Sequence, residues 1–272
     1  SELRDYFEVP DFLVGYVARS PKNELYPPLP SGWRRITNPS LAYMVLARYP
    51  SMTEDQLISR EWLDKAVQRW VEFNRNTLYG GRPGWCRPFM GQDVADLGLD
   101  KSSACFRYGS WVAPFETWQG VDADATAQRA ANLYRQYNAI WCNADANGVG
   151  AGVPGRMRSR GCDVRRIMVQ AAFDKVEEKA YQDVGQFGLV RDLGWWNLRE
   201  WLRTDPMAMV PDDEELQEEL LSLTYARDQR GKIKIVDNDT IKEKIGRSPD
   251  KATSLMLTFC PEPRKRSGKV TS

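Results

Sequence analysis

The chain has 272 residues, of which 42% are hydrophobic and 11% aromatic, enough for one large domain or for one domain with a smaller appendage. Its formal net charge is +1, so the overall charge does not by itself indicate a nucleic-acid binder. The chain contains no histidine, which excludes Ser-His-Asp and Cys-His catalysis, histidine-based zinc sites and histidine general bases. Catalysis must therefore use carboxylates, lysine, tyrosine, cysteine or metal.

The cysteine pattern and the hydropathy of the chain indicate where the protein is expected to be found. The five cysteines are scattered and include no Cys-x-x-Cys pair, which is typical of reduced, buried thiols in an intracellular protein. No run of about 18 apolar residues is present, so we expect no membrane span. The N-terminus does not resemble a secretory signal peptide. We therefore expect a protein that is neither secreted nor embedded in a membrane.

The first fifty residues are expected to be irregular, because the seven prolines in this stretch prevent long helices. Residues 53–56 have the spacing of a helix capping box, and apolar residues then recur at helical spacing to about residue 74. The glycine- and proline-rich segment 79–84 indicates a turn, and we place a domain boundary there. The sequence therefore predicts three parts: an irregular and helical extension at 1–80, a main domain at 81–262 and a basic tail at 263–272.

Strands and helices are expected to alternate beyond this boundary. Apolar runs predict strands at 87–94, 103–108, 111–118, 139–144, 165–171 and 232–236. Helices are predicted at 123–137, from about 150, at 195–202, at 212–223 and from 248, with Ser248 as the N-cap of the last one and Pro249 as its first residue. This order fits an α/β ribonuclease H-like domain, in which helices flank both faces of a mixed sheet.

Three aspartates stand in separate local settings. Asp93 lies in the apolar run Phe-Met-Gly-Gln-Asp-Val-Ala, Asp145 ends the run Ala-Ile-Trp-Cys-Asn-Ala-Asp, and Asp250 begins the last apolar helix. These positions converge in the expected topology, and carboxylate oxygens are ligands that Mg²⁺ prefers. Carboxylates so close repel one another, so the cluster is poor for stability unless a metal occupies it. The pattern favours metal-assisted phosphodiester cleavage.

Each acid also has a simpler interpretation. Asp93 can be a solvated acid at a strand end, and Asp250 can be a first-turn acid that stabilises the helix dipole. The glycine-rich turn 148–152 after Asp145 could bind phosphate, but its spacing matches neither GxGxxG nor GxxxxGKS/T. We interpret its glycines as allowing a helix N-terminus to approach a ligand or the DNA backbone. Asp100 is either a further acid that supports the metal site or a plain loop residue.

Basic residues are concentrated in the segment 156–166. The candidates for contacting DNA phosphates are Arg156, Arg158, Arg160, Arg165 and Arg166, together with Lys242 and Lys244. For any single arginine, a solvated helix face is the competing interpretation. The five arginines are therefore predicted as a group, next to the expected metal site, and the two lysines are further candidates for phosphate contact.

Several of these segments resemble motifs of one family, the nuclease domain of the large terminase subunit of tailed bacteriophages. Residues 91–102 resemble its first-strand motif, in which an aspartate precedes alanine by two residues and Gly-x-Asp-x-Ser follows. Residues 143–152 resemble its second acidic motif, and residues 246–259 its C-terminal motif, usually Ser-Pro-Asp, two residues, then Asp-Ala-Leu. Asn197 lies in a segment similar to a helix motif of the family, and residues 56–66 resemble the segment that joins motor and nuclease.

The resemblance implies a metal-dependent endonuclease with a ribonuclease H-like fold, which cleaves double-stranded viral DNA concatemers during genome packaging. It implies two Mg²⁺ or Mn²⁺ ions as cofactors, with Asp93, Asp145 and Asp250 as the catalytic metal-binding acids. Asp93 is then the best candidate to bridge both ions, and the other two acids hold one ion each. The small terminase subunit and the portal or procapsid are the implied partners, in the host cytoplasm.

Two departures from the family pattern affect these expectations. Thr253 and Ser254 stand where the C-terminal motif usually has Asp-Ala, which would weaken metal affinity if that second acid were needed. The chain also contains no Walker A sequence, and residues 1–75 resemble only the trailing edge of the motor that large terminases carry. We therefore expect the motor to have been removed or to lie on another polypeptide, and we predict no ATP hydrolysis by this chain.

Two other functions fit the same residues. A resolvase- or transposase-like nuclease would keep the fold and differ in cutting branched rather than linear DNA. A non-catalytic module that docks DNA or the portal in a packaging machine would keep the fold without the chemistry.

Overall fold

A computed structural model describes residues 55–76, 83–84, 86–95, 101–147, 151–172, 186–229 and 231–261, together with three short strands before residue 37. The chain divides into two compact units, Ser1–Asp55 and Gln56–Ser272. The helix predicted to follow the capping box is α2 (Arg60–Asn76), which lies within the second unit. The boundary at residues 79–84 stays a prediction, because residues 79–82 lie outside the described part of the chain.

The first unit contains a small antiparallel sheet in the order β1-β3-β2. Its strands are β1 (Tyr6–Glu8), β2 (Val17–Ala18) and β3 (Trp33–Ile36). The segment predicted as irregular from its prolines therefore holds three strands of two to four residues.

The second unit is built on a mixed sheet with the strand order β6-β5-β4-β8-β9, and β7 pairs with β5 beside this path. The strands are β4 (Phe89–Asp93), β5 (Ser102–Tyr108), β6 (Trp111–Val112), β7 (Glu116–Trp118), β8 (Cys142–Asp145) and β9 (Val164–Ile167). Strand β5 runs antiparallel to β4, whereas β4, β8 and β9 are mutually parallel. This mixed α/β architecture confirms the predicted ribonuclease H-like fold.

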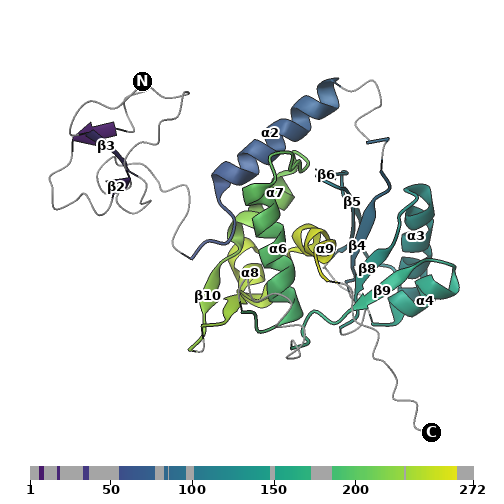
Figure 1. Cartoon of the computed structure of the whole chain (residues 1–272). Helices are drawn as coiled ribbons and strands as arrows, with labels where there is room; N and C mark the ends of the chain where they lie inside the picture. The colour runs from purple at the N-terminus through teal and green to yellow at the C-terminus, as the bar shows by residue number, and fades with distance from the viewer. Residues whose placement is uncertain are drawn as a thin grey trace, which may run out of the picture. The chain divides into compact units, whose positions relative to one another are not determined.

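Helices cover both faces of this sheet (Figure 1). One face is covered by α3 (Ala123–Gln136) and α4 (Val153–Ser159). The buried hydrophobic cluster on this face includes Met90 and Phe106 of the sheet. The other face carries α9 (Asp250–Leu257), which lies between the sheet and α6 (Val190–Thr204) in Figure 1. The remaining described elements are α7 (Glu214–Ser222), α8 (Asn238–Ile245) and the antiparallel pair β10 (Tyr225–Arg227) and β11 (Ile233–Ile235).

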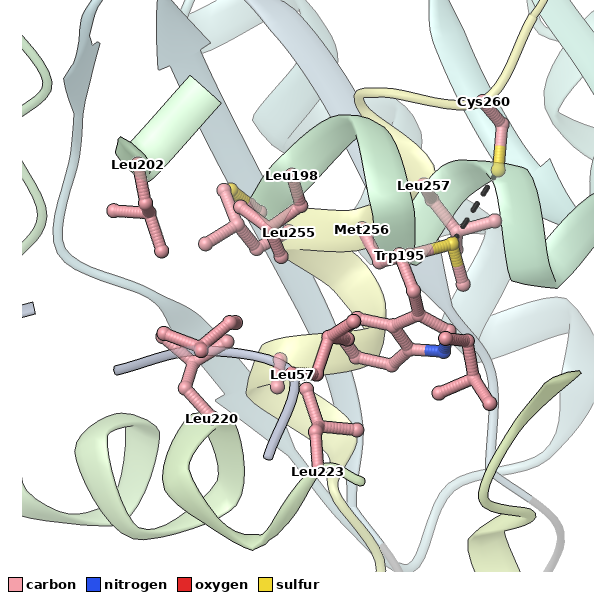
Figure 2. Packing of buried hydrophobic residues seen from close by; sticks show 14 of the residues in the cluster. Leu57, Trp195, Leu198, Leu202, Leu220, Leu223, Leu255, Met256, Leu257 and Cys260 are labelled. Atoms are coloured by element: carbon pink, nitrogen blue, oxygen red, sulfur yellow. Dashed lines mark hydrogen bonds between the residues drawn. The ribbon is translucent and has the colours of Figure 1, made fainter. Parts of the chain in front are cut away.

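The core between α6, α7 and α9 is apolar and densely packed. Figure 2 shows Trp195 of α6 among Leu57, Leu223 and Met256, all of which belong to one buried cluster. Gly194 allows this close approach, because a Cβ there would lie 2.6 Å from Met256 Sδ and 2.7 Å from Cys260 Sγ. The packing fixes α9 between α6 and the sheet.

A single glycine sets the contact between α9 and the sheet. A Cβ on Gly91 of β4 would lie 1.9 Å from the carbonyl oxygen of Ser254, a distance that no side chain can adopt. Because side chains alternate along a strand, Gly91 and Asp93 belong to the same face of β4, the face that α9 covers. Ser103 and Ser254 reinforce this contact with a hydrogen bond of 2.9 Å between their hydroxyl oxygens.

Three sequence expectations about elements need correction. The strand predicted over 111–118 is interrupted between β6 and β7, where Pro114 has no N–H for a ladder hydrogen bond. The last helix begins at Asp250 with Pro249 at the N-cap, so Ser248 is not its cap. Helix α8 was not predicted, although Asp237 caps it by accepting the Thr240 N–H at 2.8 Å and Gly246 ends it with φ 79°.

Candidate metal centre

Asp93 and Asp145 lie at the carboxyl ends of two adjacent parallel strands. Gln92 of β4 pairs with Ala144 of β8, so the next residues along, Asp93 and Asp145, stand side by side. Asn143 belongs to the same face as Asp145 and donates from Nδ2 to the Leu257 carbonyl oxygen at 2.8 Å. The strand register thus directs both aspartates towards the side of the sheet that α9 covers.

Asp250 reaches this end of the sheet from α9. It is the first residue of the helix, and its Oδ2 accepts the backbone N–H of Lys101 at 3.0 Å. Lys101 directly precedes β5, whose Ser103 pairs with Asp93. The three predicted acids, which are far apart in the sequence, therefore come from β4, β8 and α9 to one region.

Their charges act on one another. Burial raises the pKa of Asp93 well above its usual range, and the negative charges of Asp250 and Asp145 raise it further. Burial also raises the pKa of Asp145, while hydrogen bonds from Asn147 and the positive charge of Arg191 act in the opposite direction. Asn147 donates to Asp145 Oδ1 from its backbone N–H at 2.9 Å and from Nδ2 at 3.0 Å. The repulsion among these carboxylates is the kind that a bound cation relieves.

Sequence reasoning missed a fourth acid, Glu219 of α7. Its side chain is buried at 1% exposure, and Oε2 accepts the N–H of Ala252 at 2.7 Å. Burial raises the pKa of Glu219 to about 8, and the charge of Asp250 contributes to the increase. The spacing of Leu216, Glu219 and Leu220 places this glutamate on the apolar face of the helix, which is the signal that could have revealed it.

The side chains of these acids are of the chemical type that binds a hard divalent cation, but in the described part of the chain they are not close enough together to form a complete site. Carboxylate oxygens are the ligands that Mg²⁺ and Mn²⁺ prefer. Among the residues that the structure describes, however, no group of three or more Cys, Asp or Glu side chains comes together closely enough to hold a metal ion. The acids share an electrostatic environment, and metal binding by them stays a proposal.

Two other predicted features are only partly described. Asp100 lies outside the described residues, and so do the glycines of the turn from 148 to 150. At the C-terminal motif, Thr253 and Ser254 are both buried, and Ser254 contacts the sheet through Ser103. Ser254 therefore contributes to the packing of α9 on the sheet.

The predicted arginines are divided between α4 and β9, and most make local contacts. Arg160 donates to both carboxylate oxygens of Asp124, and Arg156 Nε lies 3.6 Å from the same residue. Arg158 donates from Nε to the Val164 carbonyl oxygen at 2.7 Å. Arg165 lies over the ring of Trp141, 3.9 Å from its centroid. Arg166 is exposed on β9.

The two predicted lysines lie elsewhere. Lys242 and Lys244 are exposed on α8, which packs against α7 and lies on the opposite side of the sheet from α4 (Figure 1). Lys244 Nζ donates to the Ser222 carbonyl oxygen at 3.3 Å. The structure therefore does not bring the lysines together with the arginines, and a DNA contact by either group stays a prediction.

A separate cavity of about 270 Å³ lies between α2 and the end of α6, lined by residues that include Trp62, Lys65 and Arg203. None of the four acids lines it. Within the described part of the chain, no helix is both long and apolar enough to cross a bilayer.

Comparison with solved structures identifies the fold. The nuclease domain of the large terminase subunit of bacterial virus Sf6 superposes with a TM-score of 0.59 and 25% sequence identity, over 75% of this chain and 99% of that domain. A lysine-to-alanine variant of the same domain, solved with manganese, gives a TM-score of 0.59 and 24% identity over the same shares of the two chains. No protein-family model matches the sequence, and no curated protein matches it.

The chain therefore has the fold of a terminase nuclease domain, which confirms the resemblance seen in its motifs. The match covers nearly the whole length of the Sf6 domain, so the similarity of fold extends over that whole domain.

Proposed function

We propose that this chain is a metal-dependent endonuclease that cleaves double-stranded viral DNA concatemers during genome packaging. One observation carries the proposal: Asp93 and Asp145 end neighbouring parallel strands, and Asp250 begins the helix packed across them. The fold gives independent support, because the similar Sf6 domain is a terminase nuclease and was solved with manganese.

The chain's own residues would divide the work as follows. Two Mg²⁺ or Mn²⁺ ions, when bound, would activate a water and stabilise the leaving 3′ oxygen. Asp93 is proposed as the acid that would contact both ions, because it ends β4, the central strand of the sheet, beside Asp145 of β8. Asp145 is oriented by Asn147, and Asp250 by the backbone N–H of Lys101. Asp100 is proposed as a further acid of the site.

DNA binding is proposed for exposed cations of α4 and β9. Arg166 is exposed, and Arg156 Nε lies 3.6 Å from Asp124 Oδ1, so both can turn to phosphate oxygens. The guanidinium of Arg160 is held by Asp124 and is better suited to fixing α4 against α3. We extend the proposal to the small terminase subunit and the portal or procapsid as partners, in the host cytoplasm.

A non-catalytic docking role is the second candidate. It is favoured by the finding that no three acids among the described residues form a metal-holding group. Calorimetric titration with Mn²⁺ separates the two functions, because a docking module would release no heat of metal binding.

Plasmid nicking tests the proposed activity. We expect Asp93→Asn to lower the rate of Mg²⁺- or Mn²⁺-dependent nicking at least roughly a thousandfold, since one acid would be lost from both ion sites. Asp64→Asn is the matched control, because Asp64 is exposed on α2 and its replacement should leave nicking unchanged. Circular dichroism should show both variants folded. Undiminished nicking by folded Asp93→Asn would refute the assignment.

A further inference from the structure

The first turn of α9 receives no capping hydrogen bond from the side chain of its own N-cap residue. Its N-cap residue is Pro249, which makes no side-chain capping hydrogen bond. The first amides of a helix have no acceptors within the helix, so they need one from elsewhere. Glu219 of α7 supplies it, because its Oε2 accepts the N–H of Ala252 at 2.7 Å. A glutamate from a different helix thus caps the turn that begins with Asp250.

A second glutamate of α7, Glu215, forms ion pairs with two lysines that adjoin Asp250, namely Lys101 in space and Lys251 in sequence. Glu215 Oε1 lies 2.9 Å from Lys101 Nζ, and its Oε2 lies 2.7 Å from Lys251 Nζ. Lys101 is the residue whose backbone N–H donates to Asp250 Oδ2, and Lys251 is the next residue after Asp250. Glu215 therefore links the donor that orients Asp250 to the helix that carries it.

Stability alone does not account for Glu219. The side chain is 1% exposed on the apolar face of α7, beside the buried Leu216 and Leu220. Its ion pair with Arg247 is long, with 3.7 Å between Arg247 Nε and Glu219 Oε1. A buried carboxylate so weakly paired stabilises a fold less than an apolar residue of the same size would. Its contact with α9 is the geometric reason for a charged acceptor at this position.

We infer that Glu219, supported by Glu215, is a positioning residue that holds Asp250 in the orientation for metal binding. The inference rests on the proposed function, because it assigns these residues to the same metal centre. Glu219 acts on the metal through α9, and Glu215 acts through Lys101 and Lys251.

Mn²⁺ affinity, measured by calorimetry on the full chain, tests this role. Glu219→Gln keeps an oxygen that can accept the Ala252 N–H, so Mn²⁺ affinity should stay within about threefold of wild type. Glu219→Leu removes the acceptor and should weaken Mn²⁺ binding about tenfold, the effect of losing a helix cap. The nicking rate of Glu219→Leu should recover at saturating Mn²⁺, whereas that of Asp250→Asn should not. Glu214→Gln, an exposed position on the same helix, should match wild type.

The outcomes separate this inference from the proposed function. If wild type binds no Mn²⁺, both are overturned together. If wild type binds Mn²⁺ and a folded Glu219→Leu binds it equally well, only the positioning role is overturned. If Glu219→Gln is as defective as Asp250→Asn, Glu219 binds the metal itself and does not merely position Asp250.

The Glu215 variant keeps the inference testable if Glu219→Leu does not fold. Glu215→Gln loses the charge that holds Lys101 and Lys251, and we expect it to weaken Mn²⁺ binding about threefold relative to Glu214→Gln. Equal affinities of these two variants would contradict the inference.

Discussion

Asp93 is the residue on which the other acids of the site act. Burial raises its pKa, and so do the negative charges of Asp250, Asp145 and Glu219. Four carboxylates that lie near one another oppose folding whenever they are ionised, unless protons or cations neutralise them. We therefore expect the free energy of unfolding to depend on pH when no metal is bound, and to depend on it less when metal is bound.

Glu219 gives this dependence a defined direction. Its pKa is raised from 4.5 to about 8 in the folded protein, so the folded state holds its proton more tightly than the unfolded state does. The stability that Glu219 contributes is fully present below the pKa that it has in the unfolded state. This contribution is lost as the pH rises through the pKa that Glu219 has in the folded state. In EDTA, the free energy of unfolding in urea should fall between pH 5 and pH 8 by on the order of a few kcal/mol, at about 1.4 kcal/mol per pKa unit.

Two comparisons check this pH dependence. Glu219→Gln cannot ionise, so its free energy of unfolding should change less with pH, whereas Glu214→Gln should follow wild type. Saturating Mn²⁺ at pH 8 should restore stability, because a ligand that binds only the folded state adds to its free energy. A wild-type stability that rises from pH 5 to pH 8 in EDTA would contradict the account.

The residues of the site differ in how far the sequence could predict them. Asp93 and Asp145 follow apolar strand runs, so their placement at strand ends could be inferred from local pattern. Glu219 belongs to an acidic stretch that resembles a solvated helix start, and only its spacing relative to Leu216 and Leu220 indicates burial. Whether three carboxylates close on one ion depends on side-chain orientation, which periodicity does not encode.

At the scale of elements, α9 and β4 form the contact that places Asp250. Gly91 permits the approach, and Asn143 and Ser103 bind α9 through hydrogen bonds to the Leu257 carbonyl and the Ser254 hydroxyl. A helix seated on the sheet in this way cannot shift without moving Asp250 away from Asp93.

Gly91→Ala tests this contact. The added Cβ would lie 1.9 Å from the Ser254 carbonyl oxygen, so α9 must move and the free energy of unfolding should fall by about 1–3 kcal/mol. Gly155→Ala is the matched control, because nothing lies within 4 Å of a Cβ there and alanine favours a helix by up to about 1 kcal/mol. Urea unfolding measures both variants. An unchanged stability of Gly91→Ala would mean that α9 does not rest on β4.

Local sequence patterns could not predict some of the elements correctly. The apolar run at 111–118 indicates a single strand, but Pro114 cannot donate to the ladder and the run divides into β6 and β7. Helix α8 has only one buried residue, Ile241, so its hydrophobic periodicity is too weak to reveal it. The last helix begins at Asp250, one residue later than expected, because Pro249 has ψ 59° and lies outside the helical region.

At the scale of the whole molecule, the order of strands and helices was enough to predict a ribonuclease H-like fold. Three antiparallel strands followed by parallel ones allow few topologies, because connections between parallel strands need a crossing helix. The match to the Sf6 terminase nuclease domain agrees with that topology. Gathering four acids near one end of this sheet costs stability, and the proposed metal centre would offset that cost.

Asp93, Asp145 and Asp250 are proposed to hold divalent ions jointly. Anomalous diffraction from crystals soaked in Mn²⁺ would show whether they do. We expect two manganese peaks, both within coordination distance of Asp93, with Asp145 and Asp250 each contacting one of them. A map with no manganese among these three side chains, in crystals that bind Mn²⁺ elsewhere or not at all, would contradict the proposal.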